Sequence, residues 1–295
     1  MLTAEPSVDQ ASGLRRMVNP RPVRAIAVTG GKGGVGKTNV SVNLGVAMCE
    51  IGHKVMLLDA DLGLANIDII YGVHPRYNIG DVLSGEKELK EVIVEGPSGV
   101  RVIPAGSGFV NLTRLTDGQK LNLLSEFESF EDDFDYFLID TGAGISDNVT
   151  YFNLAADECI VLVSPEPTSI TDAYALIKVL SLEYDTQHFR VLANQVQSAQ
   201  EGRDLFNKIS RVTDRYLDVT LEFIGVVPHD DYLRKAVRKQ RAVVQAYPRS
   251  RSALAFKNLA QKTDRWPVPC AAGGHLEFFI ERLIQSRNAT MEVLA

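Results

Sequence analysis

Short apolar runs alternate along this chain with longer segments in which apolar residues recur every three or four positions. The short runs predict buried strands, and the longer period predicts helices that pack against them. The predicted strands are 24–29, 54–58, 100–103, 136–139, 158–163, 189–193 and 222–227, and the clearest helices are 38–51, 168–182, 200–217 and 250–262. This alternation predicts an α/β fold with a doubly wound, mainly parallel sheet and helices on both faces.

The texture of the sequence divides the chain into three parts. Residues 1–22 contain three prolines and few large apolar side chains, which indicates a flexible N-terminal tail. Residues 23–268 carry the whole strand and helix pattern. Residues 269–295 begin with a linker rich in proline and glycine and continue into a short helical pattern from His275 to about Gln285.

Composition narrows the class of protein. The 295 residues are 45% hydrophobic and 23% charged, which is ordinary for a globular chain, and the net charge of −6 gives no global attraction to nucleic acid. Cys49, Cys159 and Cys270 are widely spaced, which fits a reducing cytosol better than a disulfide scaffold. No signal pattern or apolar run of membrane-spanning length is visible, so we expect a cytoplasmic protein.

Residues 31–38 match the phosphate-binding pattern G-x-x-x-x-G-K-[ST], between the first predicted strand and the first helix. Glycines let successive N–H groups surround a phosphate, and the helix N-terminus adds partial positive charge. We expect Lys37 to reach the β- and γ-phosphates and the Thr38 hydroxyl to ligate Mg²⁺. The predicted nucleotide-binding residues of this segment are Gly33, Gly34, Val35, Gly36, Lys37, Thr38 and Asn39.

Acidic residues follow two other predicted strands. Asp59 and Asp61 come at the end of one strand, and Asp140 ends another, directly before the glycine-rich turn that contains Gly144. Carboxylates at the carboxyl ends of parallel strands face the ligand crevice, where they can hold a Mg²⁺ shell or orient an attacking water. Because strand residues alternate in direction, Asp59 and Asp61 should share one side. The alternative is that both are exposed loop acids.

A second lysine in the loop, Lys32, points to an additional role, since an ordinary phosphate loop needs only one. It could supply charge to the phosphates of a partner subunit, or it could be a solvated surface lysine. Residues 32–38 resemble the deviant Walker A motif of the MinD/ParA group of P-loop ATPases, in the SIMIBI class, and the resemblance extends from Val23 to Trp266. It implies an ATP-sandwich homodimer in which Lys32 acts in trans.

The same resemblance implies roles for the acidic positions and for the base. Asp61 would position the hydrolytic water, and the catalytic set would be Lys32, Lys37 and Asp61. The metal set would be Thr38, Asp59 in the second shell and Asp140 through water, and the Gly144 amide would sense the γ-phosphate. Asn194, Pro228 and Asp230 would flank adenine, and no N-K-x-D guanine motif is visible, so we expect ATP/ADP with Mg²⁺.

Residues 9–15 read D-Q-A-S-G-L-R and resemble the motif of the flagellar-number regulators called FlhG or FleN. The resemblance implies that Gln10, Leu14 and Arg15 dock on FlhF, an SRP-type GTPase, and stimulate its GTP hydrolysis. The alternative is an unstructured tail of chance composition. Residues 165–174 also resemble a family segment near the dimer interface, with Glu166 beside the partner's nucleotide.

The C-terminal helical pattern has one apolar face, formed by Leu276, Phe279, Ile280, Leu283 and Ile284. It resembles the family's membrane-targeting helix, although its mixed charges predict weak attraction to anionic lipid. Packing against its own domain is equally favoured from the sequence. Our interpretation is that the helix docks without ATP and is released, in the ATP dimer, to the inner face of the cell membrane, at a pole.

A basic run of Arg234, Lys235, Arg238, Lys239 and Arg241 lies on a predicted helix. ParA relatives bind DNA through such patches, but a solvated face or a protein-docking surface is favoured here, and we do not expect DNA as a partner. The leading hypothesis is a regulatory ATPase of flagellar number or placement, with FlhF, a C-ring protein and a flagellar transcription activator as partners. The alternatives are a ParA-type partitioning ATPase, a cell-division MinD and, less favoured, an iron–sulfur relative.

Overall fold

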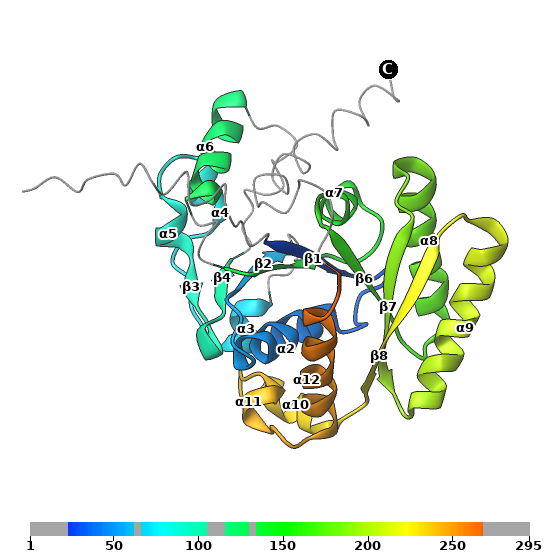
Figure 1. Cartoon of the computed structure of the whole chain (residues 1–295). Helices are drawn as coiled ribbons and strands as arrows, with labels where there is room; N and C mark the ends of the chain where they lie inside the picture. The colour runs from blue at the N-terminus through cyan, green and yellow to red at the C-terminus, as the bar shows by residue number, and fades with distance from the viewer. Residues whose placement is uncertain (1–22, 62–65, 105–115, 130–133, 268–295) are drawn as a thin grey trace, which may run out of the picture.

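The computed structural model describes residues 23–61, 66–104, 116–129 and 134–267 (Figure 1). Gln10, Leu14 and Arg15 of the tail motif lie outside these residues, as does the apolar face of the C-terminal helix. The predictions for both segments therefore stay predictions. The predicted boundaries of the three parts of the chain also stay predictions.

An eight-stranded sheet forms the centre of the molecule, in the order β3-β4-β2-β5-β1-β6-β7-β8. Only β3 runs antiparallel to its neighbour, and all other pairs are parallel. The predicted doubly wound, mainly parallel sheet is confirmed. The strands are β1 Arg24–Thr29, β2 Val55–Ala60, β3 Val94–Glu95, β4 Arg101–Ile103, β5 Tyr136–Thr141, β6 Glu158–Val163, β7 His188–Val196 and β8 Thr220–Pro228.

Helices cover both faces of the sheet (Figure 1). One face carries α2 Lys37–Glu50 and α12 Arg251–Asp264, with α3 Ile67–Tyr71, α10 Asp231–Arg238 and α11 Val243–Ala246 beside them. The other carries α4 Ile79–Leu83, α5 Leu89–Val92, α6 Asp117–Glu128, α7 Asp147–Ala155, α8 Pro167–Tyr184 and α9 Ala199–Tyr216. A single 3₁₀ turn, η1 Pro97–Gly99, precedes β4. None of the helices in the described residues is long and apolar enough to cross a membrane.

Successive strand residues feed opposite hydrophobic layers. Leu57 packs into the layer of α2 and α12, whereas its neighbours Met56 and Leu58 pack into the layer on the other face. All three side chains are buried. This two-sided burial explains why the strands read as continuous apolar runs rather than as alternating ones.

The short elements were not predicted. Strand β3 and the helices α3 to α7 and α11 are absent from the sequence-based expectation. For α3, α4, α5 and α11 the reason is length, because a helix of four or five residues cannot show a 3.6-residue period, whereas α6 and α7 have twelve and nine residues and were missed despite their length. Local capping defines some of them instead: Asn78 accepts the Gly80 N–H at 2.8 Å, and Asp81 accepts the Asn78 N–H at 2.7 Å, at the start of α4.

The end of the described chain is fixed to the sheet at the amino ends of the strands, opposite the phosphate loop. Arg24 at the start of β1 donates to the carbonyls of Trp266 at 3.0 Å and Pro267 at 2.7 Å. The Arg190 guanidinium lies 3.9 Å from the centroid of the Trp266 ring and pairs with Glu158 and Glu222. The C-terminal segment therefore leaves the domain from the amino ends of the strands.

Candidate active site

The phosphate loop connects β1 to α2, as predicted. Gly34 and Gly36 have φ of 81° and 93°, which is the left-handed region that favours glycine. A Cβ on Gly36 would lie 2.4 Å from Nδ2 of Asn194, and one on Gly31 would lie 2.0 Å from the carbonyl oxygen of Asp172. The loop therefore requires glycine at Gly34 for its conformation, at Gly31 for space, and at Gly36 for both.

Two amide side chains from the end of β7 hold the loop from outside. Asn194 donates through Nδ2 to the Val35 carbonyl at 2.7 Å, and Gln195 donates through Nε2 to the Gly34 carbonyl at 3.1 Å. Gln195 has φ of 61°, an uncommon conformation for a residue with a side chain. Asn194 was predicted to read adenine, and that role stays a prediction. Gln195 was missed, and the sequence carries no signal for it.

Lys37 is buried beneath the loop, with its side chain directed toward acidic residues. Burial lowers the pKa of its ammonium group, and the charges of Asp140 and Asp61 partly offset that effect. Its Nζ lies 3.4 Å from the Lys32 carbonyl. A buried, preoriented ammonium at this position is suited to contact phosphate oxygens.

Asp59 and Asp140 lie opposite each other on the adjacent strands β2 and β5, and both are buried. Ser41 donates its hydroxyl to Oδ1 of Asp140 at 2.9 Å, and the Thr38 hydroxyl also hydrogen-bonds this carboxylate. Burial, followed by the charge of Asp59, raises the pKa of Asp140 to about 7. Ser41 was missed, although it lies one helical turn after Thr38, on the same side of α2.

Asp59 is held by backbone amides at the start of α3. Its Oδ2 accepts the N–H groups of Asn66 at 3.2 Å and Ile67 at 3.3 Å, and its Oδ1 accepts that of Asp61 at 3.2 Å. Burial raises the pKa of Asp59 to about 6 despite these bonds. Asp59 and Asp61 are therefore next to each other at the end of β2, but Asp61 lies one residue beyond the strand.

The oxygen donors at this edge fit a magnesium ion. Thr38 and Asp140 supply a hydroxyl and a carboxylate in direct contact, with Asp59 on the neighbouring strand. Mg²⁺ prefers such oxygen ligands and keeps several waters, so that a few protein oxygens suffice. Within the described residues no cluster of three or more His, Cys, Asp or Glu side chains of metal-binding geometry occurs. The Thr38 and Asp140 pair is thus the candidate for the ion.

Asp61 lies next to the turn that follows β5. A Cβ on Gly142 would be 3.7 Å from Oδ1 of Asp61, and the negative charge of Asp61 acts to raise the pKa of Lys37. Within the same turn Gly144, with φ of 94°, donates its N–H to the Gly30 carbonyl at 3.3 Å. The structure thus brings Asp61 close to Lys37 and to the glycine-rich turn that contains Gly144. The water-positioning role of Asp61 and the phosphate-sensing role of Gly144 stay predictions.

Lys32 does not point to its own buried site. Its Nζ forms an ion pair with Glu166 and donates a hydrogen bond to Oγ1 of Thr168 at 2.9 Å. Both residues belong to the start of α8, where Glu166 is the N-cap residue and Thr168 lies in the first turn. In the single chain Lys32 is therefore held at the surface of its own subunit. Thr168 was not among the predicted site residues.

A cavity of about 370 Å³ lies beside the loop and brings together Asn39, Asn194, Pro228 and Asp230. Asn194, Pro228 and Asp230 are the residues predicted at the base, and Asn39 was predicted to bind nucleotide as part of the phosphate-loop segment. The cavity is completed by Gln195, His229, Leu233, Arg234, Val237 and Arg238. Oδ1 of Asn39 is buried without a hydrogen-bond partner among the described residues, so an acceptor is left for a ligand at this wall.

Asp230 has a structural task at the same cavity. Its Oδ1 accepts the Tyr232 N–H at 2.9 Å as the N-cap of α10, and its Oδ2 accepts the N–H and the hydroxyl of Ser252, each at 2.9 Å. Burial by itself would raise its pKa, but the hydrogen bonds from Ser252 and Tyr232 leave the pKa below its usual value.

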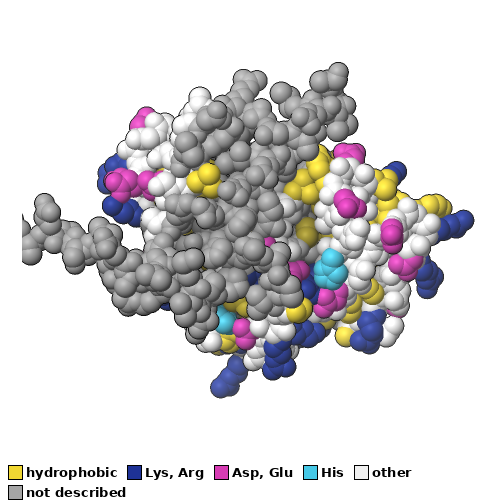
Figure 2. All heavy atoms as spheres, turned by 45° about the horizontal axis from the view of Figure 1, so that its top comes forward, with side chains coloured by type: hydrophobic (Ala, Val, Ile, Leu, Met, Phe, Trp, Pro, Cys, Tyr) yellow, Lys and Arg dark blue, Asp and Glu magenta, His cyan; other side chains and the backbone are white. Residues whose placement is uncertain are grey.

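The basic run is only partly helical, which corrects the sequence-based expectation. α10 ends at Arg238, with Lys239 as its C-cap and Arg241 beyond it, since Gln240 has φ of 53° and stops the helix. Arg234 and Arg238 line the base cavity. On the face shown in Figure 2 basic and acidic side chains are intermixed around the margins, without one extended basic field.

Comparison with known proteins identifies the family. The family described as an AAA domain matches residues 23–197. The chain is 54% identical over 272 residues to the antiactivator FleN of Pseudomonas aeruginosa, covering 92% of this chain and 97% of that protein. This chain belongs to the FleN family of MinD/ParA-type ATPases.

Other relatives agree with the FleN assignment. The flagellum site-determining protein YlxH of Helicobacter pylori is 36% identical and covers 78% of each chain. The crystal structure of the cell division ATPase MinD of Pyrococcus furiosus matches with a TM-score of 0.64 at 27% identity, covering 82% of this chain and 98% of that one. FleN-family membership supports ATPase activity, and the predicted P-loop fold is confirmed.

Proposed function

We propose that the chain binds MgATP, forms a homodimer around two nucleotides and hydrolyses ATP as the step that returns it to the monomer. The observation that carries this proposal is Lys32, a loop lysine whose ammonium lies at the surface on Glu166 and Thr168 rather than in its own buried site. The family assignment supports the reaction, and a MinD from Pyrococcus horikoshii was solved with Mg-ADP.

Each site residue has a task that follows from its environment. The loop amides and Lys37 bind the phosphates, and Thr38 and Asp140 would hold Mg²⁺, which would supply positive charge next to the phosphates. Asp61, beside Lys37 and the turn after β5, orients the water. Lys32 leaves Glu166 and reaches the partner's nucleotide. Charge supplied in trans stabilises phosphoryl transfer by large factors, on the order of 10³ or more.

Lys32→Ala tests this role. We expect the variant to bind ATP, because the residues that form its own pocket are unchanged, but to lose ATP-dependent dimerisation and most turnover, by about 10³-fold. The measurement is the steady-state ATPase rate at several protein concentrations, with nucleotide affinity measured in parallel. Lys178→Ala, an exposed lysine of α8, is the matched control. Wild-type turnover by Lys32→Ala would disprove the assignment.

We further infer that this ATPase regulates flagellar number or placement. Support comes from the relatives, named an antiactivator and a flagellum site-determining protein, and from the D-Q-A-S-G-L-R motif at 9–15. The SRP-type GTPase FlhF, a C-ring protein and a flagellar transcription activator are the proposed partners. The helix containing Leu276 to Ile284 is the proposed reversible contact with the inner face of the cell membrane, at a pole.

Deletion of residues 1–20 tests the partner assignment. Because the ATPase domain begins at about residue 23, we expect the truncated chain to hydrolyse ATP at the wild-type rate but to lose stimulation of FlhF GTP hydrolysis. The measurement is the GTPase rate of FlhF with the full and the truncated chain at equal concentration. The ATPase rate of the truncated chain is the control for folding. Undiminished stimulation would rule out the tail as the activator.

A further inference from the structure

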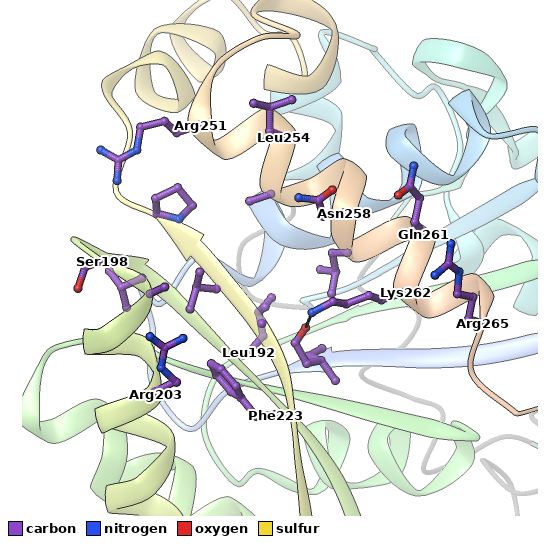
Figure 3. A pocket seen from close by; sticks show the side chains of 18 residues that line it. Leu192, Ser198, Arg203, Phe223, Arg251, Leu254, Asn258, Gln261, Lys262 and Arg265 are labelled. Carbon is purple, nitrogen blue, oxygen red and sulfur yellow. Dashed lines mark hydrogen bonds between the residues drawn. The ribbon is translucent and has the colours of Figure 1, made fainter.

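The open edge of the sheet forms a groove that is separate from the loop and its acids. Strand β8 pairs with β7 on one side only, and its outer edge lies between α9 and α12. A cavity of about 720 Å³ follows this edge. Figure 3 shows Arg203 and Phe223 on the α9 side of β8, and Lys262 reaching from α12 to the strand on the other side.

The walls of the groove combine apolar and cationic side chains. Its apolar part includes Phe223, Val226 and Leu254, of which Leu254 is 51% exposed. Its charged residues are Arg203, Arg251, Lys262 and Arg265, and among the residues that the structure describes no aspartate or glutamate lines it. In a chain of net charge −6, four cations without an acid in one groove are a local reversal of sign.

None of the four cations forms an ion pair with a residue in the described part of the chain. Their hydrogen bonds there go to neutral oxygens: Arg203 donates to Gln200 at 3.1 Å, Arg251 to the Gln197 carbonyl at 3.3 Å and Lys262 to the Ile224 carbonyl at 3.1 Å. A lysine has three donors and an arginine five, so most donors of these groups have no described acceptor. The groove can therefore receive carboxylates.

Lys262 brings a charge from α12 to the unpaired edge of β8. Its ammonium group donates to the Ile224 carbonyl on β8, and a lysine charge at an edge strand opposes pairing with apolar strands. A carboxylate on an incoming segment offsets the cost of desolvating this ammonium group. The edge thus discriminates in favour of acidic segments.

We propose that the β8 groove docks an extended acidic segment of a partner protein, whose carboxylates contact Arg203, Lys262 and Arg265 and whose apolar side chains pack on Phe223 and Leu254. Extended segments bind open sheet edges by this combination of backbone and side-chain contacts. The apolar floor favours a peptide over nucleic acid, whose phosphates would require an exposed basic surface. The groove shares Pro228 with the base cavity, but Arg203, Lys262 and Arg265 line the groove alone, so the proposed ion pairs involve no predicted nucleotide residue.

Fluorescence anisotropy with the full chain tests this proposal. The probe is a labelled decapeptide of alternating glutamate and valine, and its counterpart has every glutamate replaced by glutamine. We expect the glutamate peptide to bind at least about 10-fold more tightly, and more weakly at high salt, because ion pairs of exposed groups are screened. Equal affinity of the two peptides, or no binding of the glutamate peptide up to about 1 mM, contradicts the proposal.

Charge reversal in one helix localises the binding. Arg203→Glu lies in the groove, whereas Lys208→Glu is exposed on the same α9 but does not line it. Arg203→Glu should weaken the glutamate peptide about 10-fold or more, Lys208→Glu should have little effect, and both should keep the wild-type ATPase rate. Equal effects of the two reversals would place the binding outside the groove. Binding of a DNA duplex that is lost in Arg203→Glu would reassign the groove to nucleic acid.

Discussion

At the residue scale, the site depends on the close approach of Gly36 and Asn194. The loop passes over the end of β7 so tightly that Asn194 Nδ2 reaches the Val35 carbonyl at 2.7 Å. The same contact leaves no space for a side chain at Gly36. The loop amides are therefore set before nucleotide arrives, which lowers the conformational cost of binding phosphate.

Gly36→Ala should weaken nucleotide binding by at least about 10-fold, because a left-handed alanine costs about 1–2 kcal/mol and its Cβ would displace Asn194. Titration with a fluorescent ATP analogue measures this. Gly52→Ala is the control: Gly52 has φ of 100° at the other end of α2, with no atom within 4 Å of its added Cβ. It should lose stability but keep affinity. Equal nucleotide affinity of the two variants would show that the close approach of Gly36 and Asn194 is unimportant for binding.

The residues of the candidate site differ in how far the sequence predicts them. The phosphate-loop pattern predicts Lys37 and Thr38 at fixed positions after β1, and Asp140 is predicted because it follows the apolar run of β5. Neither pattern predicts the Gln195 bond to Gly34, because a single polar side chain has no periodic pattern and its partner is 161 positions away. The contact of Lys32 with Glu166 is of the same nature.

At the element scale, the buried central strands and the four longest helices of the described residues were predicted, whereas α6 and most of the short elements were not. The ends of α2, α8, α9 and α12 lie within two residues of the expected ones, and β1 and β6 are as expected. Burial on both faces gives the strands an apolar run, and length gives these helices a period. By contrast, α10 beside the base cavity depends on a cap and on tertiary contacts. Asp230 is the clearest of these, since it joins α10 to the start of α12.

Asp230→Ala should lower the free energy of unfolding by about 1–2 kcal/mol at pH 7, because the N-cap and the Ser252 contacts are lost. The folded pKa of Asp230 is lowered, so its contribution is present above the unfolded pKa and is lost as pH falls through the folded value. The gap to wild type should be constant from pH 7 to about 5 and narrow below about 4. Urea unfolding at several pH values measures it.

Asp231→Ala is the matched control for this series. Asp231 is the exposed neighbour in the first turn of α10, and within the described residues it is Asp230 that bonds to Ser252 and joins the two helices. Its replacement should cost less than about 1 kcal/mol through the helix dipole alone. A gap between Asp230→Ala and wild type that does not change with pH would show that the carboxylate charge is irrelevant to the cap.

At the scale of the whole molecule, three regions of the sheet are separate from one another: the carboxyl ends of the strands, their amino ends and the outer edge of β8. The phosphate loop, the acids and the base cavity lie at the carboxyl ends of the strands, where ligands bind in such folds. The chain leaves the domain at the opposite edge, through Trp266 and Arg24. The open β8 edge is a third region.

Sedimentation velocity with Mg²⁺ and either ADP or ATP tests the central claim most directly. We predict a monomer with ADP for wild type and for Asp61→Ala. With ATP, wild type should form a dimer that reverts as ATP is consumed, whereas Asp61→Ala should stay dimeric because the water is no longer oriented. A molecule that remains monomeric with saturating ATP in both proteins would contradict the account.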